Sequence, residues 1–298
     1  MIVEPALTTP VRRLGEREID FSRRIAVMAI VNRTPDSFYD NGATFGLEAA
    51  VASGTAAFDA GADLVDVGGV KFAPGPPLPV DEELARVLPV VRALAPAGPV
   101  SVDTFQPAVA EAAIAAGAAV INDTTGVHDP AMADVVADSG ATLVIAHSLA
   151  APRTQLPQPH YDDVVAEVVA FLRERVDLAL AHGVPPERIV IDPGHDLNKN
   201  TRHSLELTRR LGELTAFRLP MLVALSNKDF VGETLDRPRD GRLSGSLAAA
   251  VFCATQGARI VRAHNVAETV DALRMVEAIL GWREPAFVLH NTRPEGNT

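Results

Sequence analysis

Short apolar runs alternate with longer amphipathic stretches along most of the chain. A short, continuous apolar run is typical of a strand that is buried on both faces of a parallel sheet. Eight such runs occur, at Ile25–Val31, Leu64–Val67, Val100–Val102, Ala119–Ile121, Leu143–Ala146, Ile189–Ile191, Met221–Leu225 and Ile260–Val261. Between them lie segments with helical spacing, at Leu47–Ala60, Asp81–Leu94, Ala108–Ala116, Asp163–Ala181, Ser204–Leu214, Leu243–Gln256 and Ala267–Leu280. This α/β alternation predicts a parallel sheet, and its eight strands favour a closed (β/α)8 TIM barrel over an open doubly wound sheet.

A recurring phrase supports a repeated helix-to-strand unit. It reads GADLVDVGG from Gly61, GAAVINDTTG from Gly117, GATLVIAHS from Gly140 and GARIVRAHN from Gly257. Glycine there is expected to end a helix before a buried strand begins. We therefore expect a single barrel domain over residues 25–282, with an N-terminal extension at 1–24 and a C-terminal tail at 283–298. The Pro-rich stretch Val70–Pro79 is too irregular for a short connection and predicts a long loop.

Composition narrows the expected partners and cellular location of this protein. The 298 residues include 27 Lys and Arg against 38 Asp and Glu, a net charge of −11, which disfavours binding to nucleic acid or to an anionic membrane surface. A single cysteine, Cys253, excludes an intrachain disulfide. No apolar run is long enough to span a membrane, and the first residues lack the apolar core of a secretory signal. We expect a soluble cytoplasmic protein with no nucleic-acid and no membrane partner.

Polar residues follow the predicted strands at the point where each strand ends. They are Asn32, Asp66, Asp103, Asn122 with Asp123, His147, Asp192, Ser226 with Lys228, and Arg262 with His264. In a barrel these ends converge on one rim, where side chains from separate strands surround a ligand. A single Asp after a strand is more often a turn former or helix cap, and we assign Asp123 to that class.

The residue types on this rim suit a ligand with a donor-rich heterocycle and a phosphorylated arm. Carboxylates and amides such as Asp103, Asn122 and Asp192 would pair with an amidine-like N–C–NH2 edge. The cations Lys228, Arg262 and His264 would offset a diphosphate. Asn32 and the diphosphate would share Mg2+, which keeps mostly water ligands. The sequence has no GxSxG elbow, Walker loop, GxGxxG fingerprint or HExxH helix.

Taken in order, the motifs resemble those of the dihydropteroate synthase family. They are NRTPDSF from Asn32, VDVGG from Val65, SVDT from Ser101, IND from Ile121, DPG from Asp192, SNK from Ser226, GSLA from Gly245 and RAH from Arg262. The resemblance implies a pterin-binding barrel in which p-aminobenzoate displaces the diphosphate of a hydroxymethyl-dihydropterin. It implies catalytic roles for Asp103 and Lys228. It also implies a homodimer formed through Leu243–Gln256 and Ala267–Leu280. The roles that it implies in binding substrate and Mg2+ are carried by Asn122, Asp192, Ser226, Arg262, His264 and Asn32.

The sequence departs from the family pattern on the p-aminobenzoate side. Residues 70–75 read VKFAPG where Glu-Ser-Thr-Arg-Pro-Gly is usual, and Asn227 replaces the arginine of Ser-Arg-Lys. Phe-Gly-Phe-Gly-Lys becomes HDLNK at residues 195–199, and Met-His-Met becomes AHS at residues 146–148. Two lost charge-assisted contacts of about 1.5–3 kcal/mol each would lower turnover by about two to four decades. We therefore predict a pterin pocket with weak or absent synthase activity. The alternatives are a functional dihydropteroate synthase and a non-catalytic regulatory or scaffolding barrel.

Overall fold

Eight parallel strands form a barrel in the computed structural model, which describes residues 2–33, 46–70, 74–75, 78–154, 156 and 158–291. The strands are β3 (Ala26–Asn32), β4 (Leu64–Gly68), β5 (Val100–Asp103), β6 (Val120–Asp123), β7 (Thr142–Ala146), β8 (Ile189–Asp192), β9 (Leu222–Ala224) and β10 (Ile260–Ala263). Their order is β8-β7-β6-β5-β4-β3-β10-β9. A bridge between Ile191 and Met221 joins the two outer strands, so the sheet closes on itself. The predicted (β/α)8 fold is confirmed.

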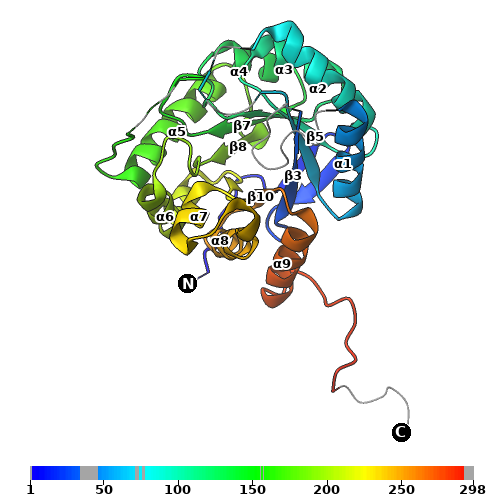
Figure 1. Ribbon diagram of the computed structural model, residues 1–298, viewed down its shortest axis with the longest axis vertical. Helices are drawn as coiled ribbons and strands as arrows, with labels where there is room; N and C mark the ends of the chain where they lie inside the picture. Colours follow the sequence, from blue (N-terminus) through cyan, green and yellow to red (C-terminus); the bar gives the residue numbers. More distant parts are fainter. Residues whose placement is uncertain are drawn as a thin grey trace.

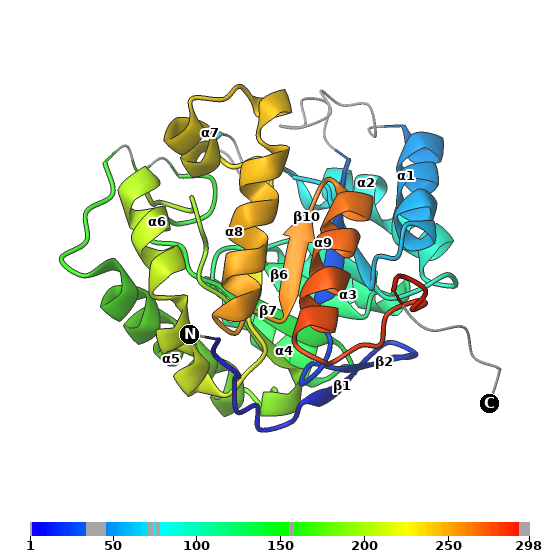
Figure 2. The same ribbon diagram turned by 90° about the horizontal axis from the view of Figure 1, so that it is seen from below.

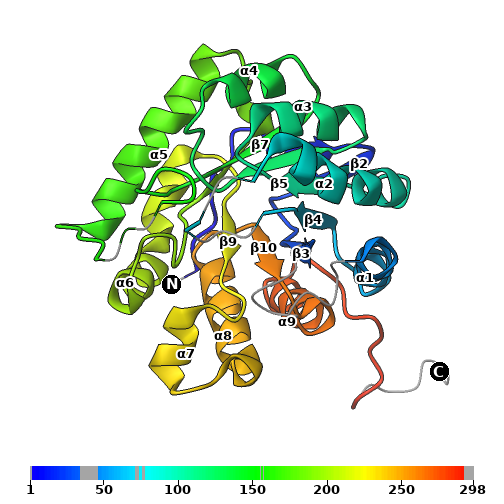
Figure 3. The same cartoon turned by 45° about the horizontal axis from the view of Figure 1, so that its top comes forward.

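The helices form a ring outside the strands (Figures 1 and 3). They are α1 (Leu47–Asp59), α2 (Val80–Leu94), α3 (Pro107–Ala115), α4 (Ala131–Ala137), α5 (Val164–Ala181), α6 (Thr201–Arg209), α7 (Asp229–Leu235), α8 (Leu243–Thr255) and α9 (Val266–Ile279). The pattern did not predict α4 and α7, because helices of 7 residues are too short to show a period. The helix predicted at Ser204–Leu214 was too long, since α6 ends at Arg209 and a 3-10 segment, Leu211–Phe217, follows.

A hairpin that the sequence pattern did not predict closes the amino-terminal end of the barrel. Strands β1 (Val11–Leu14) and β2 (Arg17–Asp20) pair antiparallel within the N-terminal extension. Leu14, Ile19 and Phe21 are buried in one cluster with barrel-interior residues such as Met28 and Leu64. Figure 2 shows the hairpin at the opposite end of the molecule from α7. The apolar side chains of the hairpin thus fill the barrel interior at that end, and the predicted site residues lie at the opposite end, at the carboxyl ends of the strands.

Strand alternation decides which side chains reach the barrel interior. Val65 and Val67 pack in the apolar cluster that includes the helices, so Leu64, Asp66 and Gly68 face inward. The same alternation turns Asp103 and Asn122 inward, and these two are register partners on β5 and β6. The last inward position is polar in five of the eight strands, at Asn32, Asp103, Asn122, Asp192 and Arg262, so these polar side chains gather at one rim.

The NRTPDSF motif and the predicted Pro-rich loop lie partly outside the described residues. The residues outside the described part are 34–38 of the NRTPDSF motif and 71–73 and 76–77 of the Pro-rich stretch. Among the helices of the described part, none combines the length and apolar character needed to cross a bilayer.

Candidate ligand site at the barrel mouth

All the residues predicted for the site line one cavity of about 250 Å3 at the carboxyl ends of the strands. They are Asn32, Asp103, Asn122, Asp192, Ser226, Lys228, Arg262 and His264. Six strands or the turns that follow them contribute these side chains. The convergence that the strand-end pattern predicts is therefore present, while the role of each residue stays a prediction.

A guanidinium between two carboxylates forms the inner end of the cavity. Arg262 Nε lies 2.7 Å from Asp66 Oδ2, and Arg262 Nη2 lies 3.3 Å from Asp103 Oδ2. Asn122 Nδ2 also donates to Asp66 Oδ2, at 3.2 Å. Asp66 was on the predicted rim without a specific role, and here it anchors both Arg262 and Asn122. The Oδ1 atoms of Asp66 and Asn122 are buried and accept no hydrogen bond within the described chain.

Burial and charge shift the pKa values of this group in opposite directions. Burial raises the pKa of Asp103 to about 7, the carboxylate of Asp66 adds to the rise, and Arg262 opposes it. Burial lowers the pKa of Arg262, but Asp66 and Asp103 outweigh it and leave that pKa above its ordinary value. The guanidinium thus stays charged, and its charge is already compensated by carboxylates.

Asp192, at the end of β8, and Lys228, directly before α7, both line the cavity. Asp192 Oδ1 accepts from the Gly194 amide at 2.7 Å, which fixes the carboxylate in a turn. Burial raises the pKa of Asp192, and Lys228 opposes that rise. Lys228 Nζ donates to the His195 carbonyl oxygen, and burial lowers its pKa against the pull of Asp196 and Asp192.

His147 and Lys199 form a buried support behind the cavity. Lys199 Nζ lies 2.8 Å from His147 Nδ1 and donates to the carbonyl oxygens of Gly194 at 3.0 Å and Leu197 at 3.2 Å. Burial lowers the pKa of Lys199 to about 7, and burial together with Lys199 lowers the pKa of His147 to about 2. His147 is therefore a neutral acceptor packed in the protein. The sequence did not predict this role of Lys199, because no motif spacing pairs it with His147.

Ser226, His264 and Asn32 occupy the remaining side of the mouth. Ser226 Oγ accepts from the His264 amide at 3.2 Å and lies 3.1 Å from His264 Nδ1. Asn32 supplies an amide oxygen at the end of β3, and no group of three His, Cys, Asp or Glu in the described residues is placed to hold a metal. One amide oxygen with diphosphate oxygens and waters suits Mg2+, so the donor set fits an ion that arrives with a diphosphate.

Asp123 does not belong to this site. Its Oδ1 accepts from the amide and hydroxyl of Thr125, at 2.8 and 2.6 Å, and its Oδ2 accepts from the Val127 amide at 3.1 Å. Burial raises its pKa to about 6, and the hydrogen bonds from Thr125 oppose the rise. The interpretation of Asp123 as a turn former is confirmed.

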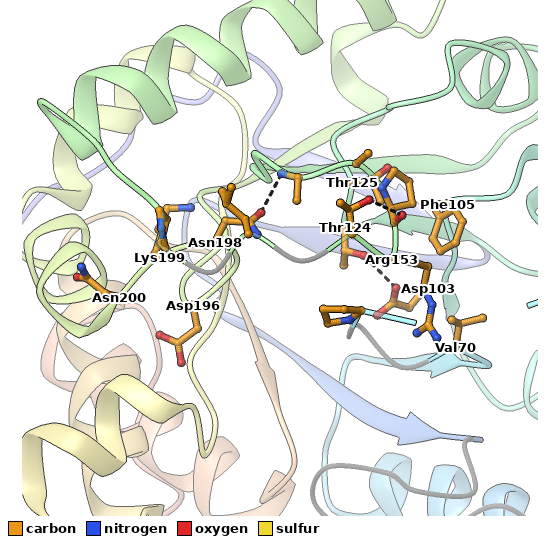
Figure 4. A pocket seen from close by; sticks show the side chains of 17 residues that line it. Val70, Asp103, Phe105, Thr124, Thr125, Arg153, Asp196, Asn198, Lys199 and Asn200 are labelled. Atoms are coloured by element: carbon orange, nitrogen blue, oxygen red, sulfur yellow. Dashed lines mark hydrogen bonds between the residues drawn. The ribbon is translucent and has the colours of Figure 1, made fainter. Parts of the chain in front are cut away.

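A second, larger cavity of about 420 Å3 adjoins the first. We call the first the inner cavity and the second the outer cavity. Val70, Asp103, Thr124 and Asp196 line both cavities. Figure 4 shows Asp103, Phe105, Thr124 and Thr125 on one side of the outer cavity, with Asp196, Asn198, Lys199 and Asn200 on the other. Most departures from the family pattern fall here or close by.

Comparisons with known proteins agree with this geometry. Residues 28–264 match the family model described as pterin binding enzyme. The chain is 48% identical to "Inactive dihydropteroate synthase 2" of Mycobacterium tuberculosis, over 88% of this chain and 85% of that protein. It is 42% identical to "Dihydropteroate synthase" of Escherichia coli, over 87% of this chain and 93% of that protein. The solved structure of Xanthomonas albilineans dihydropteroate synthase with 4-aminobenzoic acid superposes with a TM-score of 0.84 at 42% identity, covering 91% of this chain and 98% of that one.

Proposed function

Because this chain belongs to the dihydropteroate synthase family of pterin-binding enzymes, we propose that it is a divergent paralogue that binds a pterin but has weak or no synthase activity. The observation that carries the proposal is a contrast between the two sides of the mouth. The inner cavity gathers every residue expected to bind the pterin, whereas the departures from the family pattern lie on the acceptor side.

The inner cavity suits the flat, donor-rich edge of a pterin. The Asp192 carboxylate, held by the Gly194 amide, would accept hydrogen bonds from the ring N–H and amino groups. The buried, unpartnered Oδ1 of Asn122 would accept another. Asp103 would favour positive charge that develops on the methylene when the bond to diphosphate breaks. Lys228 lines the same cavity and would bind beside the ring.

A charge added by the departures disfavours the transfer step, because Asp196 places a carboxylate on the cavity where the family pattern has a glycine. The pairing of Arg262 with Asp66 and Asp103 is not one of these departures, since all three residues lie in motifs that match the family pattern. The carboxylates of Asp103, Asp192, Asp196 and Asp229 line the cavity against the cations Lys228 and Arg262. The carboxylates of the cavity outnumber these two cations, so the cavity stabilises the anionic diphosphate leaving group poorly. Mg2+ bound with the diphosphate and held in part by Asn32 would supply the missing positive charge.

The absence of an arginine at position 227 also weakens the expected binding of p-aminobenzoate. Asn227, at the position of the usual arginine, is buried, with its Nδ2 donating to Asn265 Oδ1 at 3.3 Å. Its left-handed φ of 57° is one that Asn tolerates better than most residues. A neutral amide that is bonded inside the protein provides no charge for the carboxylate of p-aminobenzoate.

Two measurements on the full chain test the proposal. Calorimetric titration with hydroxymethyl-dihydropterin diphosphate should release heat of binding, which Asp192→Asn should reduce. Adding p-aminobenzoate should then release diphosphate far more slowly than in the same assay on the Escherichia coli enzyme. Equal turnover would support the alternative of a functional synthase. No heat above dilution would instead indicate a regulatory or scaffolding barrel.

We also propose a homodimer through α8 and α9. Phe252 on α8 and Met275 and Ile279 on α9 are 43%, 61% and 69% exposed, and Met275 and Ile279 lie one helical turn apart. Large apolar side chains gathered on neighbouring helices are typical of protein interfaces. The single cysteine, which is buried and forms no disulfide, supports the expected cytoplasmic location.

A further inference from the structure

The outer cavity adjoins the inner cavity and is the larger of the two. Their volumes are about 420 and 250 Å3, and Asp103, Thr124 and Asp196 form part of the boundary that they share. A ring held by Asn122 and Asp192 would therefore direct any substituent past these three side chains. The outer cavity is large enough to take a substituent well beyond a hydroxymethyl group.

Two side chains that the family pattern lacks hold the wall of the outer cavity in place. Asp196 and Asn198 stand at the two glycine positions of the usual Phe-Gly-Phe-Gly-Lys, and their φ angles are 61° and 51°. Asn198 Oδ1 accepts from Ser148 Oγ at 2.8 Å, from the Leu149 amide at 3.0 Å and from the Ala150 amide at 3.1 Å. The loop after β8 is thereby tied to the loop after β7.

Asp196 fixes the other end of the same loop. Its Oδ1 accepts from Ser204 Oγ on α6 at 3.0 Å, and its Oδ2 lies 3.3 Å from the Phe230 amide nitrogen on α7. Glycine adopts a left-handed conformation more readily than Asp or Asn, and these hydrogen bonds offset the difference. Since both side chains are held by several partners, the wall is formed before a ligand binds.

The polar groups of this cavity favour an uncharged ligand that carries hydroxyl groups. The hydrogens of the Lys199 ammonium are directed at His147 Nδ1 and the carbonyl oxygens of Gly194 and Leu197, which leaves none for an anion. Arg153 is a second cation of the lining, and it too has a partner within the chain. Asp103 and Asp196 present carboxylate acceptors at the boundary, and a second anion there would be repelled. Asn198 Nδ2 donates no hydrogen bond within the described chain and lines the cavity. Acceptors beside an amide donor match hydroxyl groups, which both donate and accept.

We propose that the outer cavity binds the side chain of a pterin that bears an uncharged polyhydroxyalkyl group. This inference rests on the proposed function, because the ring must occupy the inner cavity for its substituent to reach the outer one. The hydroxyls donate to Asp103 and Asp196 and accept from Asn198 Nδ2. The apolar walls, which include Phe105 and Pro152, pack on the carbon chain.

Calorimetry with three pterins on the full chain tests this proposal. The probes are 6-hydroxymethylpterin, 6-(trihydroxypropyl)pterin and 6-carboxypterin. We expect the trihydroxypropyl compound to bind at least tenfold more tightly than the hydroxymethyl compound, and the carboxylate to bind more weakly than either. Equal affinities for the first two would overturn the proposal while leaving a pterin site intact. No binding of any probe would instead count against the proposed function.

Two variants locate the effect at Asn198. Asn198→Gly removes the side chain, and Asn198→Asp keeps oxygen acceptors for the loop while it removes the amide donor. In both, the ratio of the trihydroxypropyl to the hydroxymethyl affinity should fall towards one. The matched control is Asn291→Gly, which alters an exposed asparagine with a φ of 55° in the C-terminal tail and should preserve the ratio. An unchanged ratio in a folded Asn198→Asp protein would contradict the proposed contact.

Discussion

Replacing His195 with phenylalanine should make the protein more resistant to acid. The imidazole is fully buried, both of its ring nitrogens lack a hydrogen-bond partner within the described chain, and it stacks on Phe230 at a ring-centroid distance of 6.1 Å. Phenylalanine is the residue of the family pattern at this position and can keep the stacking. The variant His195→Phe therefore removes a titratable group with little change of shape.

The magnitude follows from proton binding to the two states. Burial, with Lys228 and Lys199 nearby, lowers the pKa of His195 well below 6.5 in the folded protein. Below pH 6.5 the unfolded chain binds a proton that the native chain does not, so native stability falls by about 1.4 kcal/mol per pH unit until the lowered native pKa is reached. The variant lacks this loss. Its free energy of unfolding, relative to the parent, should therefore rise by about 1.4 kcal/mol between pH 7.5 and pH 5.5.

The offset at neutral pH is the balance of two opposing contributions. Removing unsatisfied buried ring nitrogens stabilises by about 1–3 kcal/mol, whereas the larger phenyl ring can cost a similar amount through overpacking. The pH dependence is the decisive quantity, because His147 and the buried carboxylates are common to both proteins and cancel in the difference.

Urea denaturation of the parent and the variant at pH 7.5, 6.5 and 5.5 measures this difference. His160→Phe serves as the control, since His160 has 86% of its side chain exposed, and its curve should run parallel to that of the parent. If His195→Phe also ran parallel to the parent over this range, His195 would protonate as easily in the folded chain as in the unfolded one, and the account of its burial would be wrong.

Three further outcomes are expected. Because the pKa of Asp103 is about 7, the affinity for 6-hydroxymethylpterin should fall as the pH drops from 8 to 6, while Asp103→Asn should bind more weakly with a flat profile in the same titration. Gly194→Ala should lower the free energy of unfolding by at least about 2 kcal/mol in urea, because φ is 69° and a Cβ would lie 2.2 Å from the His147 carbonyl oxygen, whereas Gly140→Ala meets nothing within 4 Å and should change little. Met275→Lys combined with Ile279→Lys should convert a dimer to a monomer in light scattering, and an unchanged mass would exclude this face as the interface.

The barrel and the convergence of its site could be predicted because both depend on the strand period. Inward and outward residues alternate along a strand, so Asp103 and Asn122 reach the same rim once the strands are parallel and in register. A polar residue at the last inward position of an apolar strand is visible in the sequence. This rule accounts for Asn32, Asp103, Asn122, Asp192 and Arg262. Ser226, Lys228 and His264 reach the same cavity from the segments that follow β9 and β10.

The remaining features depend on contacts between distant parts of the chain. The hairpin β1–β2 has only 4 residues in each strand, and its apolar side chains find partners only inside the closed barrel. The pairing of Lys199 with His147 joins residues that are far apart in sequence, and no local pattern marks it. Asp66 was visible as a rim residue, but its bonds to Arg262 and Asn122 depend on the closure of the sheet.

The changes on the acceptor side affect both stability and ligand choice through the same atoms. Asp196 and Asn198 replace glycines, which removes backbone freedom from the loop after β8, and their hydrogen bonds join that loop to α6, to α7 and to the loop after β7. A loop tied in this way is less able to close over a small acceptor. Asp196 also adds a carboxylate beside Asp103 at the boundary of the two cavities. A diphosphate and an aryl carboxylate are both anions, so one substitution disfavours both substrates of the synthase reaction, whereas a neutral hydroxylated pterin loses nothing from it.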